Sequence, residues 1–489
     1  MGSRIWNSRL AGMCVMLGFS TSMAVIPNTI SFVNAFMNGT TGVTFARPVF
    51  FAQVPGKDST YVILEQQRGN AIIARRNNGS WIKDTLLKQT VVSNQNEMGF
   101  LGLAFHPNFL TNRKYYVFYS KTGTGCDATN CGLNVIEERQ TDSTLIKDAG
   151  VAPRLILNIP KSASNHNGGD IHFGPVDGYL YIGLGDGGNP QGDPTSTALP
   201  LGRAQKTDTI LGKFLRIDVN GTTGSKPYAI PSDNPFVSNA AYLPEIYAIG
   251  VRNPWRWNFD PLNANLWAGE VGNNTREEID TVTKGANLGW RNMEGFACQP
   301  SVTCTVTDPK YTLPIAAYPH GTTPDTVGNA VVGGFVYRGK PASIYYGLYF
   351  YGDNGTGQVW VVRVINGRIA ERITLHPTPA GTTVAKTGLS AFGQDLKGNL
   401  YALGSGTSNT GTVDILSSPD LVSTGLPTPA SISPHRTGKA FAPISVGDLS
   451  NLDLHNLQGR KVQGGALRNG VYVTQRPGEK NAALVPVLK

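Results

Sequence analysis

The chemistry that this sequence offers centres on a histidine in a polar, glycine-rich loop. His166 lies in the stretch NHNGGDIH, which directly precedes a strand-like run, DGYLYIGLG. The chain has only seven histidines, and a neutral imidazole can remove the proton of a hydroxyl group near pH 7. His166 is therefore a candidate general base, and the alternative is a hydrogen-bonded structural histidine. His172, one strand step further, is the better candidate for mere packing.

The elements that must position this loop are short strands. The chain has 58 Gly and 31 Pro and only 15% charged residues, which is too little Glu, Lys and Arg for long exposed helices. A turn leading into a short aromatic strand recurs six times, around Tyr61, Tyr116, Tyr181, Trp267, Tyr349 and Tyr401. Repetition of this kind predicts an all-β fold, a six-bladed β-propeller, in which neighbouring blades complete each other's core.

The two ends of the chain differ from the middle. Basic residues and an apolar stretch near the start predict a signal peptide over approximately residues 1–35, with a membrane anchor as the alternative. Residues 421–440 are rich in Pro, Ser and Thr and predict a linker, followed by a small β-module over 441–489. That module resembles the C-terminal sorting modules of type IX secretion substrates, and the alternative is an accessory β-domain.

The net charge and the cysteine spacing indicate which partners and which cellular compartment to expect. The formal net charge is +9, but no run of five basic residues occurs, so nucleic acid is not an expected partner. Outside the signal segment the cysteines form two close pairs, Cys126 with Cys131 and Cys298 with Cys304. Two short disulfide loops in an exported protein are the expectation, and a zinc site is a remote alternative.

A series of motifs resembles one known family. The segments are NEMGFLGLAFHPNF, NHNGGDIHFGP, LGKFLRIDVNG, YAIGVRNPWRWNFDP, GEVGNNTREEID and NLGW. In this order they look like the soluble quinoprotein glucose/sorbosone dehydrogenases, which include aldose sugar dehydrogenases. The resemblance implies that residues 42–420 form a six-bladed propeller that binds pyrroloquinoline quinone (PQQ) and calcium.

The resemblance also implies roles for individual residues. His166 falls on the catalytic base, and Asp186, in GDGG, falls on the carboxylate that orients it. Arg252 and Asn253, in GVRNP, match the pair that contacts the quinone, where a guanidinium stabilises developing negative charge. Without the resemblance, Asp186 reads as an Asp–Gly turn and Arg252 as a surface residue before an Asn-Pro turn.

Four further positions are implied as calcium ligands. Gly272 and Asn273 fall where the family uses backbone carbonyls for the calcium beside PQQ. Glu278 and the carbonyl of Leu288 match a second, structural calcium site. The alternative for Glu278 is a solvated acidic turn.

The chain departs from the family at several cofactor positions. Glu97 stands where the family has a glutamine that touches PQQ, and Arg338 can stand for a lysine. The late arginines that clamp PQQ are missing from the stretch GLSAFGQDL, which has Ser390 and Phe392 instead. This form is closer to the hedgehog-interacting-protein-like branch.

These features predict an exported quinoprotein oxidoreductase, secreted, periplasmic or at the cell surface. It would oxidise an aldose-type sugar or a related hydroxyl compound by hydride transfer to PQQ, and pass electrons to an unidentified acceptor. The tail would engage secretion machinery. The alternative is a propeller that binds a glycan or protein without catalysis, and a calcium-dependent lactonase or esterase is a third reading.

Overall fold

The computed structural model describes residues 26–92, 97–122, 132–161, 163–188, 202–300, 302–321, 328–365, 367–377, 388–406, 409–417, 454–455, 470–474 and 483–487. Contacts divide the chain into two units, Met1–Leu421 and Val422–Lys489. Most of the predicted signal peptide, the whole predicted linker and the pair Cys126 and Cys131 lie outside the described residues. They stay predictions.

The larger unit is built from antiparallel runs of four strands. Three runs are separate sheets. They comprise β8 (Phe100–Phe105), β9 (Lys114–Lys121), β10 (Gly132–Gln140) and β11 (Arg154–Lys161); β12 (Ile171–Phe173), β13 (Leu180–Leu184), β14 (Lys213–Ile217) and β15 (Ile246–Ile249); and β16 (Pro254–Phe259), β17 (Leu266–Glu270), β18 (Arg276–Val282) and β21 (Ala316–Pro319).

Three further runs are joined into one twelve-stranded sheet. They comprise β22 (Val331–Val336), β23 (Tyr349–Asp353), β24 (Val359–Ile365) and β25 (Arg368–Pro377); β26 (Leu389–Gln394), β27 (Leu400–Gly404), β28 (Thr412–Ser417) and β1 (Thr29–Asn34); and β4 (Pro48–Gln53), β5 (Thr60–Glu65), β6 (Asn70–Asn77) and β7 (Ser80–Lys88). The joints are parallel pairings of β1 with β25 and of β26 with β4.

The first and last parts of this unit meet in one run. β1, from the start of the described chain, pairs antiparallel with β28, with Phe32 opposite Leu416. This pairing covers the outer edge of β28, which would otherwise present free backbone groups. The last residues of the predicted signal peptide, Thr29–Asn34, therefore lie in a strand of this unit.

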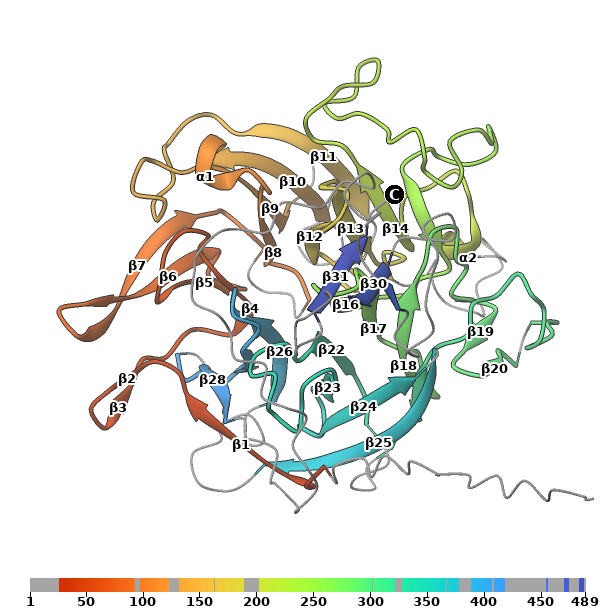
Figure 1. The fold of residues 1–489 in the computed structure, drawn as a ribbon. Helices are drawn as coiled ribbons and strands as arrows, with labels where there is room; N and C mark the ends of the chain where they lie inside the picture. Colours follow the sequence, from red (N-terminus) through yellow and green to blue (C-terminus); the bar gives the residue numbers. More distant parts are fainter. Residues whose placement is uncertain are drawn as a thin grey trace, which may run out of the picture. The chain divides into compact units, whose positions relative to one another are not determined.

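The inner strands converge at the centre of the larger unit. Figure 1 shows β4, β8, β12, β16, β22 and β26 around the middle, with their partner strands farther out. Each inner strand ends near a phenylalanine, and the half-buried Trp255 of β16 packs against three different hydrophobic clusters. Only a residue near the common centre of the strands can contact all three.

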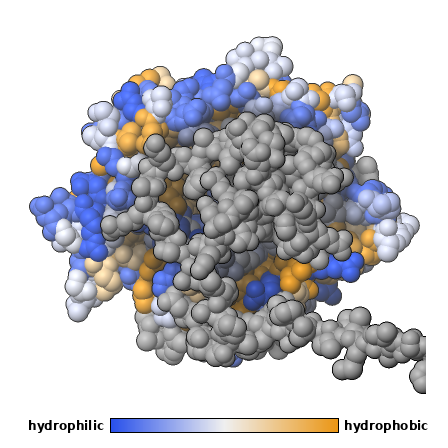
Figure 2. All heavy atoms as spheres, in the orientation of Figure 1, coloured by the Kyte–Doolittle hydropathy of each residue, from blue (hydrophilic) through white to orange (hydrophobic). Residues whose placement is uncertain are grey.

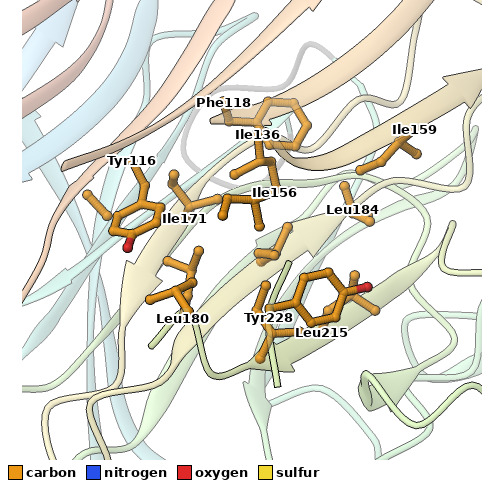
Figure 3. Packing of buried hydrophobic residues seen from close by; sticks show 14 of the residues in the cluster. Tyr116, Phe118, Ile136, Ile156, Ile159, Ile171, Leu180, Leu184, Leu215 and Tyr228 are labelled. Carbon is orange, nitrogen blue, oxygen red and sulfur yellow. The ribbon is translucent and has the colours of Figure 1, made fainter. Parts of the chain in front are cut away.

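Neighbouring runs share their cores. Figure 3 shows Tyr116 and Phe118 of β9 beside Ile136 of β10, together with Ile171, Leu180, Leu184 and Leu215 from the next run. These side chains are all fully buried. Each run therefore covers a face of its neighbour, which explains why a chain of this size needs no second core for its strands.

The remaining elements are small. They are β2 (Met37–Asn38), β3 (Thr41–Gly42), α1 (Phe109–Asn112), α2 (Gly202–Gln205), β19 (Met293–Glu294) and β20 (Ala297–Cys298). The predicted disulfide between Cys298 and Cys304 is present, with its Cα atoms 5.9 Å apart. Val422–Lys489 contains a three-stranded antiparallel sheet of β29 (Leu454–His455), β30 (Gly470–Thr474) and β31 (Ala483–Val487).

The sequence expectation of an all-β chain is confirmed. The six predicted aromatic strands are also present: Tyr61 lies in β5, Tyr116 in β9, Tyr181 in β13, Trp267 in β17, Tyr349 in β23 and Tyr401 in β27. Hydrophilic and hydrophobic residues are interspersed over the described part of the face in Figure 2. Among the described residues, no helix has the length and apolar character needed to cross a membrane.

Candidate active site

The loop that carries His166 is held in an unusual conformation. His166 has a φ of +52°, a region that residues other than glycine rarely occupy. A Cβ atom at Gly185 would lie 2.2 Å from the carbonyl oxygen of His166, so the end of β13 must be glycine for the loop to pack there. The buried Lys161 ammonium donates to the Asn165 carbonyl at 2.6 Å and to the Asn167 side chain at 2.7 Å. Both neighbours of His166 are therefore fixed by one lysine.

His166 and Asp186 form a buried hydrogen-bonded pair. Nδ1 of His166 lies 2.7 Å from Oδ1 of Asp186, which also accepts from the Gly188 N–H at 2.9 Å. The Trp290 indole N–H donates to Oδ2 at 2.8 Å. Burial raises the pKa of Asp186, but the contacts with His166 and the charge of Arg252 outweigh it and hold the pKa below its usual value.

This geometry fixes the histidine tautomer. An ionised carboxylate can only accept a hydrogen bond, so the ring proton of the neutral imidazole lies on Nδ1 and Nε2 is left with its lone pair. No partner for Nε2 occurs within the part of the chain that the structure describes, and the side chain is 10% exposed. His166 is thus a histidine that is oriented on one side and open on the other, which is the arrangement of a general base.

Arg252 and Asn253 are set by a buried glutamate. Oε1 of Glu270 accepts from the backbone N–H of Arg252 at 2.7 Å and of Asn253 at 2.6 Å. The Arg252 guanidinium donates from Nη1 to the Val271 carbonyl at 2.9 Å and from Nη2 to the Asn273 side chain at 3.3 Å. Its Nε has no partner within the described chain. The guanidinium is therefore fixed in place but keeps a donor for a ligand.

Glu97 links the two loops. Its Oε2 accepts from the His166 backbone N–H at 2.6 Å and from the Asn253 side chain at 3.1 Å. Asn253 in turn accepts from the Gly168 N–H at 3.0 Å. The predicted residues His166, Asp186, Arg252, Asn253 and Glu97 are thus brought together by the fold.

A cavity of about 400 Å³ adjoins this group at the start of the inner strands. Glu97, Asn253 and Trp255 line it together with Arg47, Val49, Gln66, Val271, Ala330, Val331, Val332, Asn354, Ser390, Ser405 and Gly406. Nε of Arg47 is buried and has no protein partner within the described chain. The cavity is large enough for a small organic molecule, at the lower end of the usual range.

The two residues predicted to bind calcium through their carbonyls follow β17. The Gly272 N–H donates to Glu277 at 3.2 Å and the Asn273 N–H to Glu294 at 2.8 Å. Asn273 also contacts Arg252, which places this turn beside the guanidinium. The turn is therefore part of the same site.

Glu278 and Leu288 are both buried. Burial, followed by the charges of Glu294 and Glu277, raises the pKa of Glu278 to about 8. A carboxylate without a balancing cation favours binding of one. Among the described residues no three His, Cys, Asp or Glu side chains are arranged to hold a metal ion. This finding concerns side-chain ligands and not main-chain oxygens.

Arg338 is not brought to this site. Its guanidinium forms a two-pronged pair with Asp260, at 2.9 and 2.6 Å, and lines a different cavity. Arg338 follows the end of β22, whereas the residues of β22 at the candidate site are at the start of the strand.

The residues present fit an anionic cofactor in part. The Nε atoms of Arg47 and Arg252 are donors without a protein partner in the described chain, and such groups suit carboxylates or a quinone oxygen. Glu97 opposes this charge, but its carboxylate is engaged by two donors of the protein. In the region of the missing late arginines, the Ser390 hydroxyl donates to main-chain carbonyls instead of facing a ligand.

Sequence reasoning missed four residues of the site. Arg47 stands alone before β4, and only its place ahead of an inner strand could have indicated it. Lys161, Glu270 and Trp290 act through the loops that they hold. Burial lowers the pKa of Lys161 to about 7, although Glu97 and Asp186 oppose the shift.

Comparison with known proteins gives one family. The model described as Glucose / Sorbosone dehydrogenase matches residues 45–376. The chain is 32% identical to the HIPL2 protein of Arabidopsis thaliana over 55% of this chain and 44% of that protein. It is 29% identical to quinoprotein glucose dehydrogenase B of Acinetobacter calcoaceticus over 49% of this chain and 50% of that protein. The chain spans about half the length of these curated relatives.

Solved structures support the fold. The apo-form of the soluble aldose sugar dehydrogenase from Escherichia coli matches with a TM-score of 0.62 and 22% identity, covering 80% of this chain and all of that one. The PQQ-bound form of aldose sugar dehydrogenase from Streptomyces coelicolor matches with a TM-score of 0.54 and 20% identity, covering 80% of this chain and 99% of that one.

Proposed function

Because the chain belongs to the glucose/sorbosone dehydrogenase family, we propose that it is an exported quinoprotein that oxidises an aldose-type sugar or a related hydroxyl compound. The observation that carries the proposal is the buried pair of His166 and Asp186, which Glu97 links to a cavity that Glu97 lines together with Arg47. We also propose that the six four-stranded runs are the six blades of a propeller.

In this proposal His166 removes the proton of the sugar hydroxyl through Nε2, as the carbon-bound hydrogen leaves with its electron pair. PQQ, when bound, supplies the hydride acceptor. Asp186 keeps the proton of the imidazole on Nδ1 and stabilises the imidazolium that forms. Arg252 donates to the oxygen on which negative charge develops, and Glu270 holds the Arg252 backbone in position.

The cofactors have proposed ligands in this chain. Arg47, Arg252 and Asn253 would hold PQQ, and the carbonyls of Gly272 and Asn273 would hold the calcium beside it. Glu278 and the Leu288 carbonyl would hold a second calcium. The export route, an external electron acceptor and engagement of secretion machinery by the tail belong to the same proposal.

The test uses the full chain supplied with PQQ and calcium. We expect aldose-dependent dye reduction and a change in quinone absorbance, and we expect His166→Ala to abolish both while calorimetry still detects PQQ. His376→Ala is the matched control, since that residue lies in the outer strand β25. Absence of dye reduction in the wild-type protein despite PQQ binding would contradict the proposal.

A second candidate function is a propeller that binds a glycan or protein without catalysis. Two observations favour it: the Glu97 carboxylate at the cavity, and Ser390 bonded to the backbone where a late arginine would be expected. The similarity to HIPL2 is consistent with it. If calorimetry with calcium present detects no PQQ binding, this second function becomes the better supported one.

A further inference from the structure

A second and larger cavity, of about 560 Å³, lies at the opposite ends of the inner strands. In β4 the first cavity is lined by Val49 and the second by Phe50–Gln53; in β26 the corresponding residues are Ser390 and then Phe392 with Gln394. The strands β4, β16, β22 and β26 thus contribute residues at or near their start to the first cavity and later residues to the second, whereas β8 and β12 contribute only to the second. It is not part of the site described above.

Trp255 separates the two cavities. It lines only the first one, donates its indole N–H to the Ser390 carbonyl at 2.9 Å and packs against three hydrophobic clusters. The next residue of β16, Arg256, lines only the second cavity. A ligand in the second cavity would therefore not compete directly with one in the first.

Arg256 offers an unused pair of donors. The residue is 3% exposed, and neither Nε nor Nη2 has a hydrogen-bond partner in the described part of the chain. These two atoms form the edge of a guanidinium that holds a carboxylate by two parallel hydrogen bonds. Arg338 lines the same cavity and uses the same edge, Nε and Nη2, for the carboxylate of Asp260. The Nε/Nη2 edge of Arg338 therefore holds a carboxylate of the protein, whereas the same edge of Arg256 has no partner in the described part of the chain.

The other edge of Arg256 is already engaged. Nη1 donates to the Trp255 carbonyl at 3.3 Å and lies 3.8 Å from Asp170, which also pairs with His172. These contacts fix the guanidinium and leave its Nε/Nη2 edge for a ligand. Asp170 balances part of the charge, and the lining also contains one further cation, Lys397, and one further carboxylate, Asp395. The preference for a carboxylate ligand therefore rests on the unpartnered Nε and Nη2 donors and not on an excess of positive charge.

Apolar side chains make up most of the lining, beside polar ones such as Gln53, Asn258 and Gln394. Seven phenylalanines contribute to it, from β4, β8, β12, β16, β22 and β26: Phe50, Phe51, Phe105, Phe173, Phe259, Phe335 and Phe392. Leu396 lines the cavity and is 66% exposed, and the exposed Val176 and Leu262 directly follow lining prolines. A ligand would meet apolar side chains both at the entrance and inside.

We propose that this cavity binds a small monocarboxylate with an apolar, ring-sized body, whose carboxylate takes two hydrogen bonds from Nε and Nη2 of Arg256. The phenylalanines cover the body of the ligand. The site is distinct from the quinone site, and its occupancy does not depend on PQQ.

Titration of the full chain with benzoate tests the proposal by calorimetry or ligand-observed NMR. We expect a dissociation constant of roughly 0.1–10 mM, as suits so small a molecule. Benzamide, which has the same shape without the charge, binds at least about 10-fold more weakly, and Arg256→Gln weakens benzoate by a similar factor. Ala52→Phe narrows the cavity, leaves Arg256 intact and weakens both ligands.

The controls separate this site from the dehydrogenase site. His166→Ala leaves benzoate binding unchanged, and so does saturation with PQQ. The proposal is overturned if the wild-type protein binds no benzoate, if benzamide binds equally well, or if folded Arg256→Gln binds benzoate like the wild type. If Arg256→Gln does not fold, the proposal is tested with Ala52→Phe and with benzamide. It is overturned if Ala52→Phe binds benzoate as tightly as the wild type, or if the wild type binds benzamide as tightly as benzoate.

Discussion

Replacement of Asp186 by asparagine tests the proposed base most directly. Oδ1 of Asp186 accepts from His166 and Gly188, and Oδ2 accepts from the Trp290 indole. All three partners can donate, whereas an asparagine side chain has one accepting oxygen and one donating nitrogen. Whichever way the amide is turned, its NH₂ group must face a donor.

Both orientations of the amide have a defined cost. If the nitrogen faces Trp290, a buried indole N–H loses its acceptor, which destabilises the protein by about 1–3 kcal/mol. If the nitrogen faces His166, the imidazole must accept at Nδ1 and carry its proton on Nε2. The histidine can then no longer take a proton through Nε2, and we expect kcat to fall by about 10²–10⁴-fold.

The assay is aldose-dependent dye reduction by the protein loaded with PQQ and calcium. We expect kcat to fall while KM and PQQ affinity stay near wild-type values, since Asp186 touches neither ligand. Asp142→Asn is the matched control, because Asp142 also accepts from a following backbone N–H, of Thr144, in a turn away from the site. A wild-type kcat together with a wild-type free energy of unfolding in Asp186→Asn would refute the assignment of His166 as an oriented base.

Four further predictions concern charge. Burial lowers the pKa of Lys213 from 10.5 to about 7. Between these two pH values the unfolded chain binds one proton more than the folded chain, so the free energy of unfolding rises with pH. We expect Lys213→Met to remove this rise in urea titrations. Burial and acidic neighbours raise the pKa of Glu278 from 4.5 to about 8. The free energy of unfolding of the metal-free chain therefore falls as the pH rises between these two values. We expect Glu278→Gln to remove this pH dependence. Arg47→Gln weakens PQQ binding about 10-fold in calorimetry. By contrast, Arg338→Gln leaves PQQ binding unchanged and lowers the free energy of unfolding by about 3–5 kcal/mol, because the 2% exposed Asp260 side chain loses its partner.

The strand content could be predicted from the sequence because it rests on local patterns. The six short aromatic runs between turn residues predicted the second strand of every four-stranded run. Pairings across the whole unit, such as that of β1 with β28, have no local signal. The edge of β28 needs a partner strand, and the strand that supplies it, β1, lies almost 400 residues away in the sequence.

Some residues of the candidate site could likewise be predicted from local motifs, whereas others could not. His166 and Asp186 could be predicted because both lie beside glycines of recognisable motifs, and the structure brings their side chains into contact. Arg338 was expected at the cofactor because it can stand for a lysine of the family, but position along the strand decides which end a side chain reaches. Arg47 and Glu270 gave no signal, since a lone arginine and a strand glutamate acquire a role only through partners far away in the sequence.

The inner strand β16 shows why both ends of this fold can carry a function. At about 3.3 Å per residue, its six residues span roughly 20 Å, so Asn253 just before it and Phe259 at its end belong to different cavities. Trp255, between them, fills the space that the inner strands leave at their common centre. A smaller residue there would join a polar cavity to an apolar one, and water could then reach the base from both sides. The indole is therefore a wall of the first cavity, and it keeps that cavity separate from the second.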